Sequence, residues 1–219
     1  MTKLWLIDLD DTLHDATQHI LPWVNRAMTD YVAAHVGVGL DQADGLRETY
    51  WTHYGATLLG LIRHHGVDPA HFLRQTHPEA DQLKIWVQPN QMLARRLMQL
   101  KGRRVLLTNA PMHYAKVVLK ARGLTHCFER IVSIEAMRIG GTLKPKPSKS
   151  MLHKIIARLG MEPSHCALIE DSRENLRAAK ALGLKTYLVH GYRKPQSRKA
   201  SPYIDHRVES SLIFRANPS

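Results

Sequence analysis

The stretch Leu4–Leu13, with the sequence LWLIDLDDTL, joins a run of four apolar residues to a cluster of three aspartates. The apolar run predicts a buried β-strand. Because side chains alternate along a strand, Asp8 and Asp10 leave its carboxyl end on the same side and close together. Such carboxylates repel each other, and Mg²⁺ with a bound phosphate oxygen is a natural partner for both. The residues therefore predict an aspartate nucleophile, Asp8, beside a second aspartate, Asp10, that can carry a proton.

The same letters also have a plainer interpretation. A strand can run into an acidic turn in which Thr12 is the N-cap of a helix, without any catalytic role. A short motif of this kind stays a hypothesis until its context agrees. Polar residues elsewhere in the chain therefore have to decide between the two interpretations.

Length and composition set the frame for that decision. The 219 residues suffice for one substantial core and a smaller second unit. Hydrophobic residues make up 44% and charged residues 23%, as in ordinary soluble proteins. No apolar run approaches the length that spans a bilayer, and the early aspartates interrupt a signal-peptide pattern, so we expect a cytoplasmic protein with no membrane partner. Cys127 and Cys166 have no metal-ligand or disulfide spacing, and we interpret both as small apolar residues.

The net charge of +12 is unevenly distributed along the chain. Residues 14–88 carry −3, whereas residues 89–219 carry +17. Such a shift suggests two units with different surfaces. A basic surface concentrates anions, which include both small phosphate esters and nucleic acid. Since no nucleic-acid-binding motif is present, a small phosphorylated metabolite is the expected partner and nucleic acid is the less favoured one.

Helical and strand patterns alternate after residue 89. The expected strands cover residues 104–107, 130–134, 166–169 and 185–189, and the expected helices cover residues 91–100, 114–122, 149–159 and 174–182. A loop rich in Gly, Lys and Pro lies between the second of these strands and the third helix. Strands that alternate with helices imply right-handed βαβ units and a mostly parallel sheet. The predicted fold class is α/β, with a Rossmann-like core.

Residues 17–86 have a different pattern, because apolar residues such as Ile20 and Val24 recur there at helical spacing without a convincing strand. We therefore expect a helical cap domain at 17–86, inserted into an α/β core formed by residues 1–16 and 87–219. An insertion of this size, directly after the reactive aspartates, is placed to act as a lid. A helical appendage with only a packing role is the alternative.

Polar residues follow two further predicted strands, at the edge where open α/β sheets bind their ligands. Thr108 and Asn109 come directly after the strand at 104–107, where Thr108 is a candidate for holding phosphate oxygens and Asn109 for orienting the substrate. A turn or helix cap explains the same pair structurally. Glu170 and Asp171 end the strand at 166–169 and are candidates for completing a Mg²⁺ site, although acids also favour the first turn of a helix.

A lysine-rich loop provides the third supporting motif. In residues 143–147, LKPKP, a lysine in a chain stiffened by proline is able to neutralise charge on the nucleophile and on a transferring phosphoryl group. A solvated lysine is the structural alternative.

Four motifs in this order, DLDDTLH, LTNAP, LKPKP and EDSREN, resemble the haloacid dehalogenase superfamily of phosphatases over nearly the whole chain. The pyrimidine 5′-nucleotidase branch with a helical cap is the most similar. The resemblance implies a set of roles: Asp8 as nucleophile, Asp10 as general acid and base, Thr108 as phosphate ligand, Lys144 as charge stabiliser, Asp8, Asp10 (through its backbone carbonyl) and Asp171 as ligands of Mg²⁺, and Asn175 in support of the metal's water shell. Lys146 and Lys149 compete with Lys144, which we prefer because its following proline and its spacing to Pro147 match the family pattern.

The expected reaction is phosphomonoester hydrolysis through an aspartyl phosphate on Asp8. A pyrimidine nucleoside 5′-monophosphate is the expected substrate, and a sugar-phosphate phosphatase or a phosphomutase is the alternative. A nucleic-acid-binding protein with a vestigial phosphatase fold is less favoured. Dehalogenation is rejected because a departing halide needs no proton, which would leave Asp10 without a task. His14, at the exit from the first strand, is the candidate for contact with the base or ribose, and a structural role for it is also open.

Overall fold

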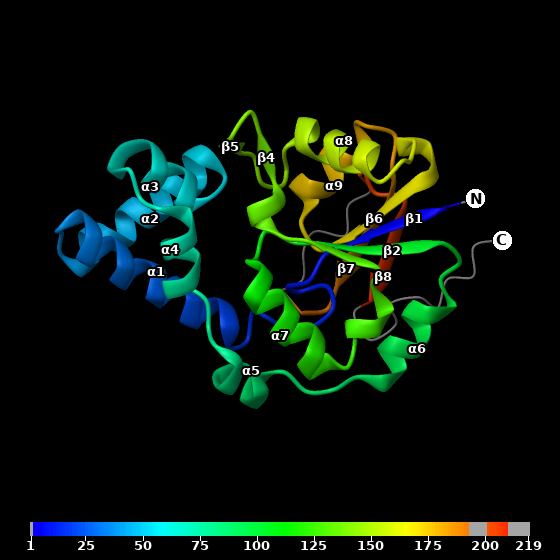
Figure 1. Cartoon of the computed structure of the whole chain (residues 1–219), viewed down its shortest axis with the longest axis horizontal. Coiled ribbons are helices and arrows are strands. Elements are labelled where there is room, and N and C mark those ends of the chain that lie inside the picture. Colours follow the sequence, from blue (N-terminus) through cyan, green and yellow to red (C-terminus); the bar gives the residue numbers. More distant parts are fainter. Residues whose placement is uncertain (1, 193–200, 210–219) are drawn as a thin grey trace.

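The computed structural model describes residues 2–192 and 201–209, so residues 193–200 and 210–219 of the predicted core unit lie outside it. Within the described chain, a six-stranded sheet has the order β3-β2-β1-β6-β7-β8 (Figure 1). Its strands are β1 (Leu4–Ile7), β2 (Arg103–Leu107), β3 (Arg130–Val132), β6 (Cys166–Glu170), β7 (Lys185–His190) and β8 (His206–Glu209). Each neighbouring pair is parallel, which confirms the predicted α/β class with a parallel sheet.

The order in which strands are added to the sheet reverses at β1. From β1 the chain first adds β2 and β3 on one side, and later adds β6, β7 and β8 on the other side. In open α/β sheets, ligands bind outside the carboxyl ends of the strands at such a switch point. Asp8 directly follows β1 and therefore lies at this position.

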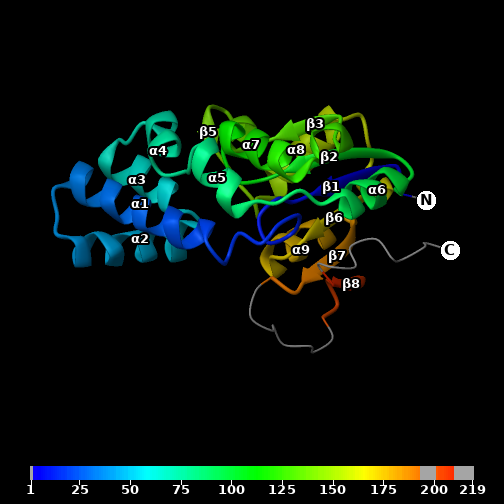
Figure 2. The same cartoon turned by 90° about the horizontal axis from the view of Figure 1, so that it is seen from below.

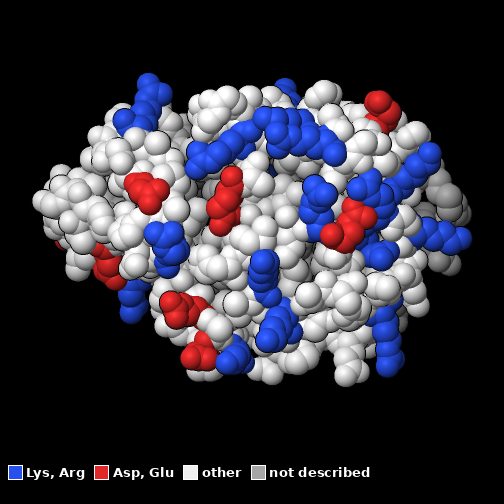
Figure 3. All heavy atoms as spheres, in the orientation of Figure 1, with Lys and Arg blue, Asp and Glu red and all other residues white. Residues whose placement is uncertain are grey.

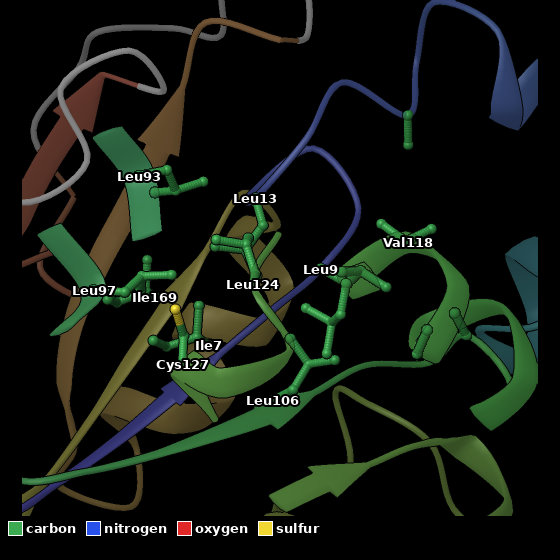
Figure 4. Close-up of a cluster of buried hydrophobic side chains, with 14 of the residues drawn as sticks. Ile7, Leu9, Leu13, Leu93, Leu97, Leu106, Val118, Leu124, Cys127 and Ile169 are labelled. Atoms are coloured by element: carbon green, nitrogen blue, oxygen red, sulfur yellow. The ribbon is translucent and has the colours of Figure 1, made fainter. Parts of the chain in front are cut away.

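The two faces of the sheet are covered by different helices. These helices are α6 (Gln91–Gln99), α7 (Met112–Arg122), α8 (Lys149–Arg158) and α9 (Arg173–Lys180). Trp5 and Ile7 share a hydrophobic cluster with α6 and α7, as Figure 4 shows for Ile7, whereas Leu4 and Leu6 pack with α8 and α9. Each buried aliphatic side chain contributes about 1.5–3 kcal/mol. β1 is thus packed on both faces, and this packing fixes the position of the residues that directly follow it.

A short hairpin leads into the lysine-rich loop. β4 (Arg138–Ile139) and β5 (Thr142–Leu143) pair in the antiparallel sense. The two residues between them are Gly140 and Gly141, with φ of 55° and 79°. Two consecutive residues with positive φ are what a tight hairpin turn requires. We did not predict this hairpin, because strands of two residues leave no alternating pattern to recognise.

Five helices precede α6: α1 (Ile20–Val36), α2 (Leu40–Tyr54), α3 (Thr57–His65), α4 (Pro69–Gln75) and α5 (Ala80–Trp86). Figures 1 and 2 show α1–α4 beyond the edge of the sheet at which the strands end. These four helices share a core that includes Tyr50 and Phe72, and Leu143 of β5 joins the same core. By contrast, α5 packs against α7 and places Leu83 in a core cluster of the sheet. The boundary of a cap at residue 86 therefore stays a prediction.

Short 3₁₀ turns complete the described elements: η1 (Thr125–Cys127), η2 (Ile134–Ala136) and η3 (Pro163–His165). Figure 3 shows Lys and Arg side chains in an arc over the β4–β5 hairpin and α8. Arg138 of β4, Lys144 directly after β5 and Lys149 at the start of α8 are exposed. The arc gives this face a field that attracts anions. Among the described residues, no helix is both long and apolar enough to cross a membrane.

Candidate active site

Asp8 and Glu170 meet at one lysine at the carboxyl edge of the sheet. The Nζ of Lys146 donates to Oδ1 of Asp8 at 2.6 Å and to Oε2 of Glu170 at 2.7 Å. The hydroxyl of Thr12 donates to the other oxygen of Asp8 at 3.3 Å. The side chains of Asp8 and Glu170 are buried, and only 9% of the Lys146 side chain is exposed. Three distant segments thus bring two acids and one ammonium together away from water.

The electrostatics of this cluster are strongly perturbed. Burial, followed by the charge of Glu170, raises the pKa of Asp8 although Lys146 opposes the shift. Burial would also raise the pKa of Glu170, but the ammonium of Lys146 and the accepted hydrogen bonds outweigh it and lower that pKa. Both carboxylates in turn raise the pKa of Lys146 in spite of its burial. Lys146 therefore stays charged, and its single positive charge is shared between two carboxylates.

The structure corrects the choice between the lysines, because Lys146, not Lys144, lies at Asp8. Leu143 of β5 faces the α1–α4 core, and the next side chain, Lys144, is exposed. The backbone N–H of Lys144 donates to the carbonyl of Met137 and continues the hairpin. Two residues later, Asn109 clamps the backbone of Lys146: its Oδ1 accepts from the Lys146 N–H at 2.9 Å, and its Nδ2 donates to the Lys146 carbonyl at 3.0 Å.

A third acid joins Asp8 and Glu170. One carboxylate oxygen of each of Asp8, Glu170 and Asp171 lies within 4.8 Å of the others, and all three residues are buried. Two of the predicted metal ligands, Asp8 and Asp171, are thus together. The additional member is Glu170, while the predicted contribution of Asp10 concerned its backbone carbonyl and stays a prediction. Oxygen donors in such a group are the ligands that Mg²⁺ prefers.

Asp10 is held apart from this acidic group. Its Oδ1 accepts from the Tyr114 hydroxyl at 2.6 Å and lies 2.9 Å from Nε2 of His14. Burial would raise the pKa of Asp10, but the hydrogen bond and charge of His14, together with the Tyr114 hydroxyl, lower it. Tyr114 is 1% exposed and His14 is 3% exposed, so both partners are fixed by packing. His14 is therefore buried against Asp10, and the predicted contact of His14 with the substrate stays a prediction.

The loop that carries these residues is fixed by Asp11. Its φ is 56°, a left-handed conformation that Asp tolerates better than most residues. Its carboxylate accepts from the backbone N–H groups of Ala16 and Thr17 at 3.0 and 2.9 Å, and from the Thr17 hydroxyl at 2.7 Å. These bonds hold the chain between β1 and α1, and with it the direction of Asp8 and Asp10.

The remaining predicted residues lie around the same edge. Thr108 is buried, and its Oγ1 accepts from the N–H of Ala110 at 3.0 Å. Asn109 serves Lys146, as described above. Asn175, in the first turn of α9, lines a small cavity with Lys146 and Leu107. The phosphate-binding role of Thr108 and the metal-supporting role of Asn175 stay predictions.

Sequence reasoning missed two members of this site. Glu170 was recognised as one of the acids that end a strand, but its contact with Lys146 was not foreseen. Tyr114 was assigned only to a helix, and nothing in its neighbourhood in the sequence indicates a bond to Asp10. The hydrophobic position of Tyr114 on an amphipathic helix favours a core interpretation, which is correct for its ring but not for its hydroxyl.

Comparison with known proteins places the chain in a family. A profile of the haloacid dehalogenase-like hydrolases matches residues 2–183, and the chain belongs to this family. Phosphate metabolism protein 8 of Saccharomyces cerevisiae is 23% identical over 201 residues, which cover 86% of this chain and only 61% of the yeast protein. A phosphoglycolate phosphatase of Aliivibrio fischeri is 25% identical over 205 residues, covering 87% and 85% of the two chains.

A solved structure shares the fold. CbbY from Rhodobacter sphaeroides, determined in complex with phosphate, aligns with 98% of this chain and 96% of its own, with a TM-score of 0.63 and 19% identity. This likeness concerns the fold alone.

Proposed function

We propose that this protein is a Mg²⁺-dependent phosphomonoesterase that forms an aspartyl phosphate on Asp8. The observation that carries the proposal is the buried carboxylate of Asp8, held at 2.6 Å by Lys146 at the switch point of the sheet. A fixed ammonium at this place offsets charge that gathers on a phosphoryl group. The similarity to a phosphoglycolate phosphatase supports the same class of reaction.

The acidic group fits a magnesium ion. The carboxylates of Asp8, Glu170 and Asp171 lie close together, whereas Lys146 supplies one positive charge to the two acids that it contacts. We assign these three residues, with the backbone carbonyl of Asp10, as the holders of the ion. When bound, Mg²⁺ supplies positive charge that stabilises the transferring phosphoryl group.

The chain's own residues then divide the reaction in two. An oxygen of Asp8 forms a bond to phosphorus while the ester bond to the alcohol breaks. Asp10, which takes up a proton when the negatively charged phosphate ester binds beside it, gives that proton to the departing oxygen. Asp10 next takes a proton from water, whose oxygen bonds to phosphorus as the bond to Asp8 breaks. Inorganic phosphate leaves, and both aspartates are restored.

Pyrimidine nucleoside 5′-monophosphates are the substrates that we propose from the motifs. Sugar phosphates or other small phosphorylated metabolites are the alternative, and the similarity to a phosphoglycolate phosphatase supports a small phosphorylated metabolite. Net phosphate release distinguishes both from a phosphomutase, which returns the phosphoryl group to a sugar. The cytoplasmic location expected from the sequence is part of this proposal.

Phosphate release with Mg²⁺ from a panel of nucleotides, sugar phosphates and p-nitrophenyl phosphate tests the proposal. We expect Asp8→Asn to lower the rate by roughly 10³-fold or more, because the nucleophile is lost. Asp15→Asn, on the same loop, is the matched control and should keep the wild-type rate. Turnover of UMP and CMP above that of AMP supports the nucleotidase assignment, whereas better turnover of sugar phosphates supports the alternative. Equal activity in wild type and Asp8→Asn contradicts the proposed mechanism.

A separate measurement addresses the metal. Mg²⁺ should raise the melting temperature of the wild type, and Asp171→Asn should reduce this shift because it removes one charged oxygen donor. An unchanged shift in Asp171→Asn would exclude Asp171 as a ligand.

A further inference from the structure

The segment between α4 and α5 brings His77 next to the proton donor of the site. The ring centroid of His77 lies 5.6 Å from that of Tyr114 and 6.4 Å from that of His113, both in the first turn of α7. Tyr114 in turn holds Asp10. In the proposed mechanism Asp10 protonates the leaving alcohol, so His77, which follows α4 and contacts Tyr114, is positioned to meet the alcohol part of a substrate.

The tautomer of His77 follows from its contacts. Nδ1 lies 3.1 Å from the carbonyl of Leu73, which only accepts, so Nδ1 carries the hydrogen. The Thr76 hydroxyl already donates to the carbonyl of Phe72 at 2.8 Å and does not compete for this role. Nε2 has no hydrogen bond to any residue that the structure describes, and it presents a lone pair. Burial also lowers the pKa of His77 to about 4, so the ring stays neutral near pH 7.

The charges around His77 restrict what it can bind. Asp10 and Glu135 are the acids whose charges act on the ring, and His113 is the base that does so. Glu135 is fixed there, because its carboxylate accepts from the N–H of Met112 at the start of α7 at 2.9 Å. A carboxylate on the alcohol part of a substrate would be repelled by these acids, whereas a neutral hydroxyl would not.

We propose that His77 is a specificity-determining residue whose Nε2 accepts a hydrogen bond from a hydroxyl on the alcohol part of the substrate. This inference rests on the proposed phosphomonoesterase function and narrows its substrates. The protein selects phosphate esters of hydroxylated alcohols, a class that contains both sugar phosphates and nucleotides. It discriminates against esters such as phosphoglycolate, in which a carboxylate takes the place of a CH2OH group.

Three small esters with the same alkyl leaving oxygen test this assignment: 2-hydroxyethyl phosphate, ethyl phosphate and 2-phosphoglycolate. We expect the wild type to turn over 2-hydroxyethyl phosphate with a kcat/KM at least about tenfold above that of the other two, since a site built for a hydroxyl rejects its analogues. His77→Leu should remove the preference over ethyl phosphate while changing turnover of ethyl phosphate itself less than about threefold. His77→Gln, which keeps an acceptor oxygen, should restore part of the preference.

His77→Arg provides a test in which activity on one substrate is expected to increase relative to another. An arginine at this position offsets the charges of Asp10 and Glu135 that repel a substrate carboxylate, so the ratio of phosphoglycolate turnover to 2-hydroxyethyl phosphate turnover should rise at least about tenfold. His126→Gln, at an exposed histidine of η1, is the matched control and should leave every ratio unchanged.

The outcomes separate this inference from the proposed function. Three results would overturn the role of His77 and leave the proposed phosphatase function intact. The first is a preference for the hydroxyl that persists in His77→Leu, and the second is wild-type turnover that favours phosphoglycolate. The third is activity on p-nitrophenyl phosphate with none on the three alkyl esters. A wild type that releases no phosphate from any ester, p-nitrophenyl phosphate included, overturns the proposed function and this inference with it.

Discussion

The carboxyl edge of the sheet and the core of α1–α4 bury polar groups in opposite ways. At the edge, Lys146 is locked between Asp8 and Glu170. In the helical region, buried hydroxyls donate to backbone carbonyls: Thr57 donates to Arg47 at 3.0 Å, and Thr76 donates to Phe72 at 2.8 Å. Truncating one partner of a buried ion pair costs about 3–5 kcal/mol, whereas a neutral hydrogen bond contributes about 1 kcal/mol. The edge therefore tolerates little change, and the helices tolerate much more.

This difference separates chemistry from selection. Preorganised charge stabilises a transition state without rearrangement, and that requires a rigid edge. On the proposed function, the alcohol part of the substrate lies toward α1–α4, whose shared core contains none of the residues that hold Asp8. On that proposal, the edge fixes the reaction and the helices choose the substrate.

The largest effect is expected from removing the ammonium that lies between Asp8 and Glu170. Lys146→Met should lower kcat by roughly 10²–10³-fold, because Asp8 and the transferring phosphoryl group lose their fixed cation. Lys144→Met is the matched control, since Lys144 is exposed, and it should change kcat less than about twofold. Steady-state rates of phosphate release measure both variants. Equal losses in the two variants would contradict the assignment of Lys146.

The second prediction concerns a substitution that disturbs packing among α1–α4 without touching the residues around Asp8. A Cβ added at Gly60 of α3 would overlap the ring of Tyr50, so Gly60→Ala should destabilise the protein by about 1–3 kcal/mol. Gly45 of α2 is exposed with open space around it, and Gly45→Ala should stabilise by about 0.5–1 kcal/mol. Urea unfolding measures the change in the free energy of unfolding for both variants. In the folded Gly60→Ala protein, kcat on p-nitrophenyl phosphate should stay near wild type, and a large loss would show that the helices and the edge are not independent.

A smaller effect lies where the two regions meet. Tyr114→Phe removes the hydroxyl that fixes the orientation of the Asp10 carboxyl, so kcat on alkyl phosphates should fall about tenfold, with little change on p-nitrophenyl phosphate, whose leaving group needs little help from an acid. Tyr54→Phe removes a comparable hydroxyl from the helical region, where it lies 2.6 Å from His64, and should leave both rates unchanged. An equal loss on both kinds of ester would mean that Tyr114 supports the fold rather than the proton transfer.

The same two regions differ in how far the sequence predicted them. The four strands and four helices expected after residue 89 follow from local periodicity, and their ends agree with the structure within about two residues. The sequence did not predict β8 or the β4–β5 hairpin. The parallel sheet follows from their alternation. Asp8 and Asp171 come together because each directly follows a strand of that sheet, so their meeting requires no knowledge of side-chain packing.

What could not be predicted depends on contacts between distant residues. The choice of Lys146 over Lys144 rests on a two-residue hairpin and on Asn109, whose clamp spans 37 positions in the chain. The bond from Tyr114 to Asp10 spans 104 positions. For His77, neither periodicity nor a motif connects the segment after α4 to the first turn of α7. Each of these contacts is set by tertiary packing, which no local pattern encodes.

The smallest effect sharpens the comparison at His77, whose pKa burial lowers to about 4 from an ordinary value of 6.5. Below about pH 6.5 the unfolded chain takes up a proton at this histidine that the folded protein refuses until about pH 4. Stability is therefore lost as the pH falls through this window and levels off below it. His77→Gln removes this loss, so between pH 7 and pH 4 it should lose less stability than the wild type, by on the order of 1 kcal/mol, because the ring is only half-buried and water relieves part of the burial. Urea unfolding at both pH values measures the difference, with His126→Gln expected to match the wild type. If His77→Gln and the wild type lose the same stability, the ring is as easily protonated in the fold as in water, and burial does not lower its pKa.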